Sequence, residues 1–230
     1  MENSVLPKSN PREVIIAPGT PLLFDMDGTL IDNMVVHHRA WQEQLAELGL
    51  HLSIAEVKEK VWGKNEDIYE RLFPGRFSPA EMRALGERKE LRYVELYSSS
   101  ISLLPGLESF LFAAKAAGCP MAVATAAPKV CVDFVSRALS LERFFPIIID
   151  ADRVERSKPF PDPYLAAAAA LGVSPEQCLV FEDAPVGVRS AEAANMAAYV
   201  LLTTHREDEF SVFSKVLGYL QDFTHVKVAN

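Results

Sequence analysis

Short apolar runs alternate with segments of helical periodicity through the second half of the chain. The apolar runs that predict strands are residues 121–124, 147–149, 179–181 and 198–202. The segments with helical spacing are residues 107–117, 130–139, 164–171 and 187–194. Because strands that alternate with helices pair in parallel through right-handed crossovers, this pattern predicts an α/β fold with a doubly wound parallel sheet.

A different pattern follows the first predicted strand, the apolar run 21–24. The segments that favour helix after it are residues 37–50, 54–61, 66–73 and 79–97. A single βαβ crossover needs far fewer residues than this, so we expect an inserted α-helical domain. The predicted boundaries assign 1–33 and 104–230 to the sheet domain and 34–103 to the helical domain. Residues 14–16, before the first strand, are a candidate edge strand.

Two aspartates, Asp25 and Asp27, stand where the first apolar run meets a turn at Gly28. They are expected at the carboxyl end of a buried strand, where open α/β sheets bind ligands. Two carboxylates this close repel each other and lose hydration on burial, so they favour a hard divalent cation such as Mg²⁺. The structural alternative is an acidic turn, because tight turns select Asp and Gly.

Polar side chains also follow the later apolar runs. Thr125 follows one run directly, Lys158 lies in the loop beyond another, and Glu182 and Asp183 come after a third. The carboxyl ends of parallel strands share one edge of a sheet, so we expect these residues to converge with Asp25 around one ligand. Taken singly, each has a structural alternative, as a strand-end residue, a solvated loop residue or a helix cap.

The composition narrows the classes of partner. The chain has 230 residues, 49% hydrophobic and 23% charged, with a formal net charge of -8. Nucleic acid is not expected as a partner, because phosphate backbones are bound by clustered Lys and Arg and the sequence shows no such cluster. No apolar run approaches membrane-spanning length and residues 1–19 lack the apolar core of a signal peptide, so we expect a cytoplasmic protein without membrane association. Three cysteines without a Cys-x-x-Cys pair indicate neither a disulfide framework nor a zinc site.

The order of the motifs carries a family resemblance. Asp25, Asp27 and the following Thr29-Leu30 precede, in turn, the threonine, the lysine and the acid pair. Between about residues 21 and 202 the chain resembles the haloacid dehalogenase-like superfamily of phosphotransferases, and within it the β-phosphoglucomutase-like group. The resemblance implies a Rossmann-like core and an inserted helical cap domain.

The resemblance also implies roles for the acidic residues. Asp25 would attack phosphorus and form an aspartyl phosphate, and Asp27 would act as general acid and base. Mg²⁺ would bind the carboxylates of Asp25 and Asp183 and the backbone carbonyl of Asp27, with Glu182 helping directly or through water. The cofactor expected from the resemblance is therefore Mg²⁺.

The transferred phosphate would be held by Thr125, by the backbone at Ala126 and by Lys158. Ala126-Ala127 departs from the family pattern, because relatives often carry a polar side chain there. Backbone amides are the expected substitute for that side chain.

The helical cap domain holds the candidate substrate residues. His37 lies in a His-x-Arg-Ala-Trp context and Lys89 lies near Tyr93, both as in β-phosphoglucomutase. Glu66 stands where the mutase has a substrate-binding arginine, and Lys64 is the candidate replacement for that charge. The alternative for His37 and Lys89 is a solvated helix face.

These observations predict a Mg²⁺-dependent phosphatase that hydrolyses a small phosphorylated metabolite, for which a sugar phosphate is one candidate, through an aspartyl phosphate. The alternative is a hexose-phosphate mutase of the β-phosphoglucomutase type. A mutase must hold two phosphates at once, so the loss of a cap cation favours hydrolysis. A third hypothesis is a catalytically silent phosphate-binding module. The expected state is a monomer or a weak homo-oligomer, and the sequence does not name the substrate.

Overall fold

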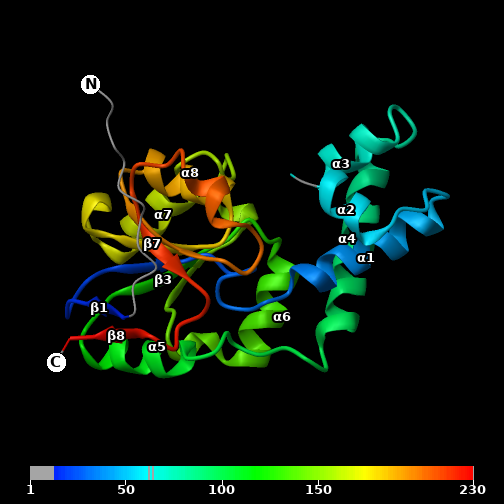
Figure 1. Ribbon diagram of the computed structural model, residues 1–230. Coiled ribbons are helices and arrows are strands. Elements are labelled where there is room, and N and C mark those ends of the chain that lie inside the picture. Colours follow the sequence, from blue (N-terminus) through cyan, green and yellow to red (C-terminus); the bar gives the residue numbers. More distant parts are fainter. Residues whose placement is uncertain (1–12, 62, 64, 230) are drawn as a thin grey trace. The chain divides into compact units, whose positions relative to one another are not determined.

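The computed structural model describes residues 13–61, 63 and 65–229, and these residues form two compact units. One unit contains the described residues up to Asp32 together with those from Ser102 onward, and the other is Asn33–Ile101. Figure 1 shows the first unit as a sheet flanked by helices and the second as a group of helices. We call them the sheet unit and the helical unit.

The sheet unit is built on a six-stranded sheet with the strand order β4-β3-β2-β5-β6-β7, in which every neighbouring pair is parallel. The strands are β2 (Leu22–Phe24), β3 (Met121–Ala124), β4 (Ile147–Ile149), β5 (Leu179–Glu182), β6 (Ala197–Leu201) and β7 (Val216–Leu220). The predicted α/β fold with a doubly wound parallel sheet is confirmed. The sequence pattern did not predict β7.

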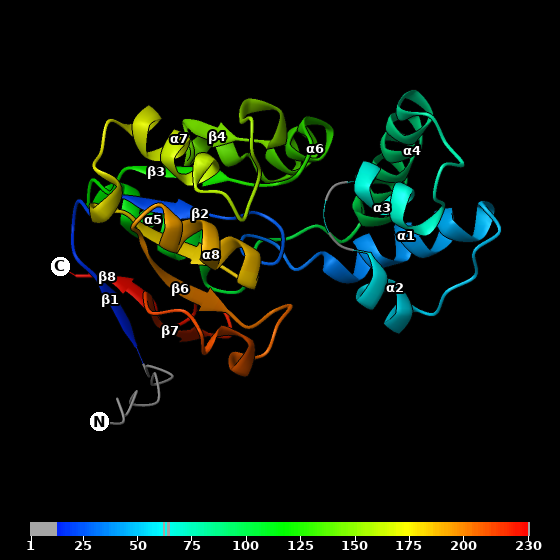
Figure 2. The same ribbon diagram turned by 90° about the horizontal axis from the view of Figure 1, so that it is seen from above.

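Helices cover both faces of this sheet (Figure 2). They are α5 (Leu107–Ala116), α6 (Lys129–Leu139), α7 (Asp162–Leu171) and α8 (Pro185–Ala193). On one face, small residues of α7 and α8 pack against Leu23, Val180 and Ala198 of the strands. On the other face, the ring of Phe24 stacks on Phe181 with a centroid distance of 5.0 Å. Because alternate residues of a strand point to opposite faces, both faces of β2 and β5 are buried.

The candidate edge strand at residues 14–16 does form, but outside the main sheet. It is β1 (Val14–Ile16), and it pairs in parallel with β8 (Val226–Val228). The sequence pattern predicted neither β8 nor this pairing, because β8 is only three residues long and follows a region without clear periodicity.

The helical unit contains α1 (Met34–Glu47), α2 (Ile54–Lys60), α3 (Asn65–Leu72) and α4 (Pro79–Tyr97). Capping boxes at Ser53 and Ser78 start α2 and α4 and satisfy the first backbone donors of each helix. The helix predicted at residues 37–50 both begins and ends earlier, as α1. It ends before Gly49, because Gly49 has a φ of 88° and the chain turns there. No helix among the described residues is both long and apolar enough to cross a membrane.

Candidate active site

The predicted polar residues lie at the carboxyl ends of adjacent strands. Asp25 follows β2, Thr125 follows β3, and Glu182 ends β5 with Asp183 next in the chain. The backbone amide of Asp25 donates to the carbonyl of Phe181 at 3.0 Å, which continues the pairing of β2 with β5. The chain order reverses at β2, which lies between β3 and β5, so these strand ends form the topological switch point of the sheet.

Lys158 joins two of these acids. Its ammonium nitrogen lies 2.5 Å from Oδ1 of Asp25 and 2.6 Å from Oε1 of Glu182. The lysine side chain is only 4% exposed, and its nitrogen lies 4.8 Å from the centre of the Tyr164 ring. The loop that follows β4 therefore delivers a buried positive charge directly to the end of β2.

Glu182 accepts four hydrogen bonds. Its Oε1 accepts from Lys158 and, at 3.0 Å, from the hydroxyl of Tyr164. Its Oε2 accepts from the backbone amides of Asp183 at 2.8 Å and Ala184 at 2.9 Å. A Cβ added at Gly187, in the first turns of α8, would overlap this carboxylate. The surroundings therefore hold Glu182 in one orientation, with one oxygen directed at Lys158.

Two other segments orient Asp183, namely the loop after β6 and the turn at Gly28 after β2. The hydroxyl of Thr204, in the loop after β6, donates to Oδ2 of Asp183. The hydroxyl of Thr203 donates to the carbonyl of Gly28 at 2.5 Å. Gly28 has a φ of 81°, and a Cβ added there would overlap Oδ2 of Asp183. The loop after β6 thus ties together the segments that carry Asp27 and Asp183.

Gly28→Ala is expected to destabilise the sheet unit by about 2 kcal/mol, because it combines a left-handed backbone conformation with overlap on Asp183. Gly118→Ala is the matched control, since Gly118 also has a positive φ, of 73°, but nothing lies within 4 Å of its Cβ position. Urea denaturation of both variants measures the difference. Equal losses of unfolding free energy would show that Asp183 yields easily to the added methyl group.

The buried acids of the cluster outnumber its one positive charge, the ammonium group of Lys158. Burial, with help from the charges of Glu182 and Asp27, raises the pKa of Asp25 to about 7 despite Lys158. Burial also raises the pKa of Asp183 well above its usual range. Ligand atoms of Asp25, Glu182 and Asp183 all lie within 4.8 Å of one another. An all-oxygen donor set with several buried acids and one ammonium suits a hard divalent cation.

Asp27 and Thr125 lie beside this cluster. Asp27 is half-buried, its backbone forms an isolated bridge with Ile31, and its charge contributes to the raised pKa of Asp25. Thr125 is buried, and its hydroxyl accepts from the amide of Ala127 at 3.0 Å. An accepting hydroxyl still has its own proton to donate. Ala126, between Thr125 and Ala127 in the chain, is exposed.

The candidate substrate residues belong to the helical unit. His37 of α1 stacks on Tyr93 of α4 with a centroid distance of 3.8 Å. Lys89 is 2% exposed, and its ammonium nitrogen lies 2.7 Å from Oε1 of Glu90 and 3.5 Å from Nδ1 of His37. The alternative of a solvated helix face is therefore wrong for Lys89. Lys64 lies outside the described residues.

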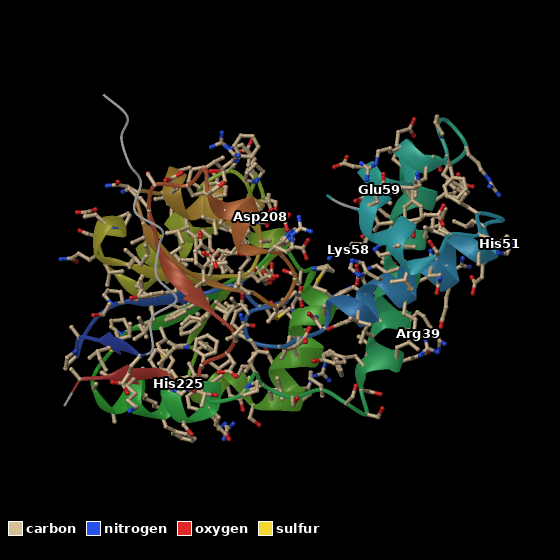
Figure 3. The ribbon with its side chains drawn as sticks, viewed as in Figure 1. Arg39, His51, Lys58, Glu59, Asp208 and His225 are labelled. Carbon is tan, nitrogen blue, oxygen red and sulfur yellow. The ribbon has the colours of Figure 1, made fainter. Side chains whose placement is uncertain are left out.

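A solvated helix face does describe Arg39, which belongs to the same motif as His37. Its side chain is 62% exposed and forms an ion pair with Glu43 one turn further along α1. Figure 3 labels Arg39 on α1 and Lys58 on α2. Lys58 is likewise exposed. Of the residues in this motif, Ala40 and Trp41 are buried, His37 is half-buried and Arg39 lies on the surface of the helical unit.

Sequence reasoning missed four residues that orient the acids, namely Tyr164, Gly187, Thr203 and Thr204. The two threonines follow the predicted strand at 198–202, so the strand-end criterion used for Thr125 would have found them. Tyr164 and Gly187 stand in predicted helices, where a polar ring or a glycine has no distinctive local pattern.

A buried nucleophile candidate, a lysine and an acid pair at the switch point of a parallel sheet define the class of α/β phosphoryl-transfer enzymes. The model of the family described as haloacid dehalogenase-like hydrolase matches residues 22–195. The chain belongs to this family, and it is an enzyme whose relatives include phosphatases.

Three relatives illustrate the similarity. Protein CbbY of Rhodobacter capsulatus is 34% identical over 83% of this chain and 88% of its own length. Fructose-1-phosphate phosphatase YqaB of Escherichia coli is 32% identical over 77% of this chain and 93% of its own. Hexitol phosphatase A of the same organism is 33% identical, with coverages of 90% and 94%.

Solved structures agree with this assignment. A haloacid dehalogenase-type hydrolase, family IA, variant 3, from Entamoeba histolytica has a TM-score of 0.82 and 29% identity, covering 88% of this chain and 93% of that one. A mutant of CbbY from Rhodobacter sphaeroides, in complex with xylulose-(1,5)bisphosphate, has a TM-score of 0.79 and 28% identity, with coverages of 94% and 97%. A β-phosphoglucomutase from Clostridium difficile has a TM-score of 0.77 and 24% identity, covering 89% and 92%, which shows the shared fold alone.

Proposed function

We propose that the protein is a Mg²⁺-dependent phosphatase that hydrolyses a small phosphorylated sugar or polyol through an aspartyl phosphate. The observation that carries the proposal is the contact of buried Lys158 with Asp25 beside the Glu182-Asp183 pair. The printed names of the relatives, fructose-1-phosphate phosphatase and hexitol phosphatase, support the substrate class.

In the first step, a carboxylate oxygen of Asp25 forms a bond to phosphorus, and the bond from phosphorus to the alcohol oxygen breaks. Asp27 gives its proton to the leaving alcohol. In the second step, Asp27 takes a proton from water as the water oxygen attacks phosphorus. The bond from phosphorus to Asp25 then breaks, which releases inorganic phosphate and restores both aspartates.

The oxygen-rich cluster fits Mg²⁺, and we assign the metal to the carboxylates of Asp25 and Asp183 and the backbone carbonyl of Asp27. When bound, Mg²⁺ would supply positive charge that offsets the repulsion between the Asp25 carboxylate and the phosphate. The buried acids then no longer repel an incoming anion. Glu182 contributes mainly through Lys158, because each of its oxygens already accepts two hydrogen bonds.

Thr125, the amide of Ala126 and Lys158 are proposed to hold the transferred phosphate. The hydroxyl of Thr125 and the lysine ammonium are donors suited to phosphate oxygens. The amide of Ala127 donates to the Thr125 hydroxyl, so it fixes the orientation of that hydroxyl. Because the amide of Ala127 is committed to this contact, the amide of Ala126 is the proposed substitute for the polar side chain that the Ala126-Ala127 sequence lacks.

The helical unit is proposed to act as a cap that selects the leaving group through His37 and Lys89. The mutase alternative is less well supported, because the charge of Lys89 is already paired with Glu90 and an acid, Glu66, stands where the mutase has an arginine. A mutase needs cationic groups for a second phosphate.

The test is phosphate release by the purified protein from a panel of sugar phosphates, polyol phosphates and an aryl phosphate. Activity is expected with Mg²⁺, and chelation by EDTA is expected to reduce it at least about a hundredfold, with recovery on addition of Mg²⁺. Turnover that survives EDTA would contradict the metal assignment. Conversion of β-glucose 1-phosphate to glucose 6-phosphate in the presence of a bisphosphate, without phosphate release, would favour the mutase.

A further inference from the structure

Two consecutive residues of α4, Lys89 and Glu90, form an ion pair in the interior of the helical unit. Their side chains are 3% and 4% exposed, and the atoms Nζ and Oε1 are 2.7 Å apart. Neighbouring residues on a helix normally point in different directions, and a buried ion pair loses the hydration of both charges. An arrangement with these costs needs support from its surroundings.

The surroundings of Glu90 provide that support. Nδ2 of Asn65, the first residue of α3, donates to Oε1 of Glu90 at 3.0 Å. A Cβ added at Gly86, one turn before Glu90, would lie 3.0 Å from Nδ2 of Asn65. Glycine weakens a helix interior, yet here it gives the asparagine side chain room to reach Glu90. Three residues of two helices are thus arranged around one carboxylate.

Glu90 remains ionised in this position. Burial alone would raise its pKa, but the charges of Lys89 and His37 and the hydrogen bond from Asn65 outweigh burial and hold the pKa of Glu90 below its usual value. The lysine ammonium therefore meets a full negative charge at contact distance. Beyond that contact, the field of the pair falls off as a dipole and not as a single positive charge.

This neutralisation matters because Lys89 also lies near aromatic and imidazole groups that suit a polyol. Its nitrogen is 3.5 Å from Nδ1 of His37 and 5.2 Å from the centre of the Trp41 ring. Because Glu90 balances the charge of Lys89, polar atoms of this cluster can exchange hydrogen bonds with hydroxyl groups. A second phosphate would approach Lys89 only by also approaching Glu90, and like charges at close range penalise binding.

We infer that Glu90 sets the charge specificity of the enzyme: by neutralising Lys89, it makes the helical unit favour phosphomonoesters with an uncharged, hydroxylated leaving group over those that carry a second phosphate. The inference rests on the proposed function, in which the helical unit selects the leaving group. Glu90 acts through Lys89 and is a positioning residue, not a catalytic one.

The experiment varies the charge of the pair in steps. Positions 89 and 90 together carry no net charge in the wild type and in the double variant Lys89→Gln/Glu90→Gln. They carry a charge of +1 in Glu90→Gln and of −1 in Lys89→Gln. The measured quantity is the ratio of kcat/KM for fructose 1-phosphate to that for fructose 1,6-bisphosphate, with Mg²⁺ present. Glu90→Gln is expected to lower this ratio about tenfold, because removal of a nearby like charge favours the second phosphate. Lys89→Gln is expected to raise it, and the double variant to restore the wild-type ratio.

Glu43→Gln is the matched control, because Glu43 pairs with Arg92 between the same two helices but is more exposed. It removes the same charge and is expected to leave the ratio unchanged. Circular dichroism monitors folding of every variant. If Glu90→Gln does not fold, the comparison of Lys89→Gln with the double variant still isolates the charge of Glu90, and the double variant should be less selective for the monophosphate.

The outcomes separate the inference from the proposed function. Wild-type protein that hydrolyses neither substrate, nor any phosphomonoester of the panel, contradicts the proposed function itself. Hydrolysis with a ratio that does not follow the charge of the pair, or a wild-type preference for the bisphosphate, overturns the inference alone. A ratio that changes equally in Glu43→Gln would show a general charge effect and would also overturn it.

Discussion

Asp25→Asn is expected to reduce the rate of phosphate release by about 10⁵-fold or more, because an amide cannot replace the carboxylate that forms the covalent intermediate. The variant keeps the size and shape of the side chain, so the phosphate site should remain intact. Rapid acid quenching and mass spectrometry of the intact protein should detect a covalent phosphate on the wild type and none on the variant.

The same substitution should not destabilise the fold, and this separates a chemical role from a structural one. Burial raises the pKa of Asp25 to about 7, which means that its ionised form is unfavourable in the folded protein. The stability cost is therefore present at pH 8 and diminishes as the pH falls through 7 and the group is protonated. A neutral asparagine removes that cost, so thermal unfolding at pH 8 should occur at an equal or higher temperature.

Asp133→Asn is the matched control for this experiment. Asp133 forms an exposed ion pair with Lys129 at the start of α6, and its side chain is 43% exposed. The control is expected to retain wild-type turnover and stability. Substantial turnover by Asp25→Asn would remove Asp25 from the proposed role.

The sequence sufficed to predict the convergence of Asp25, Thr125, Glu182 and Asp183 because that convergence follows from topology. Parallel strands present their carboxyl ends at one edge, and the apolar runs before these residues identify the strands. The placement of Lys158 is less direct, since a loop separates it from β4. The sequence analysis nevertheless included this lysine, because it lies in the loop beyond the apolar run 147–149 and the family resemblance gives it a role.

Contacts between distant segments could not be predicted in the same way. The approach of Gly187 to Glu182 and of Thr204 to Asp183 depends on how α8 and the loop after β6 pack, which no local pattern encodes. The same holds for Asn65, which reaches Glu90 across 25 residues. Residues of this kind orient the acids, so the sequence identified the acids and the lysine of the cluster more completely than the residues that position them.

Lys158→Met is expected to lower kcat/KM by about 10³-fold, because it removes a buried donor for the phosphate and the positive charge beside Asp25. Glu182→Gln should cost less, about a hundredfold, and mainly by releasing Lys158 from its position. If Glu182 acts through Lys158, the double variant should lose no more than Lys158→Met alone. The measurement is a double-mutant cycle in kcat/KM.

Stability provides an independent readout of the same cycle. Without Lys158, the buried acids lose their compensating charge, so Lys158→Met should destabilise the protein. The pKa values of Asp25 and Asp183 are already raised, and each ionised carboxylate costs more without the lysine. The loss of stability should therefore increase as the pH rises from 6 to 8, and urea denaturation at both pH values measures it.

Lys129→Met is the control, since Lys129 is 62% exposed and its loss should change neither activity nor the pH dependence of stability. The cycle also distinguishes the two roles considered for Glu182. A direct metal ligand would give losses that add in the double variant and a higher Mg²⁺ concentration for half-maximal activity in Glu182→Gln. A residue that positions Lys158 gives losses that do not add and an unchanged Mg²⁺ requirement, which is the outcome expected from its four hydrogen bonds.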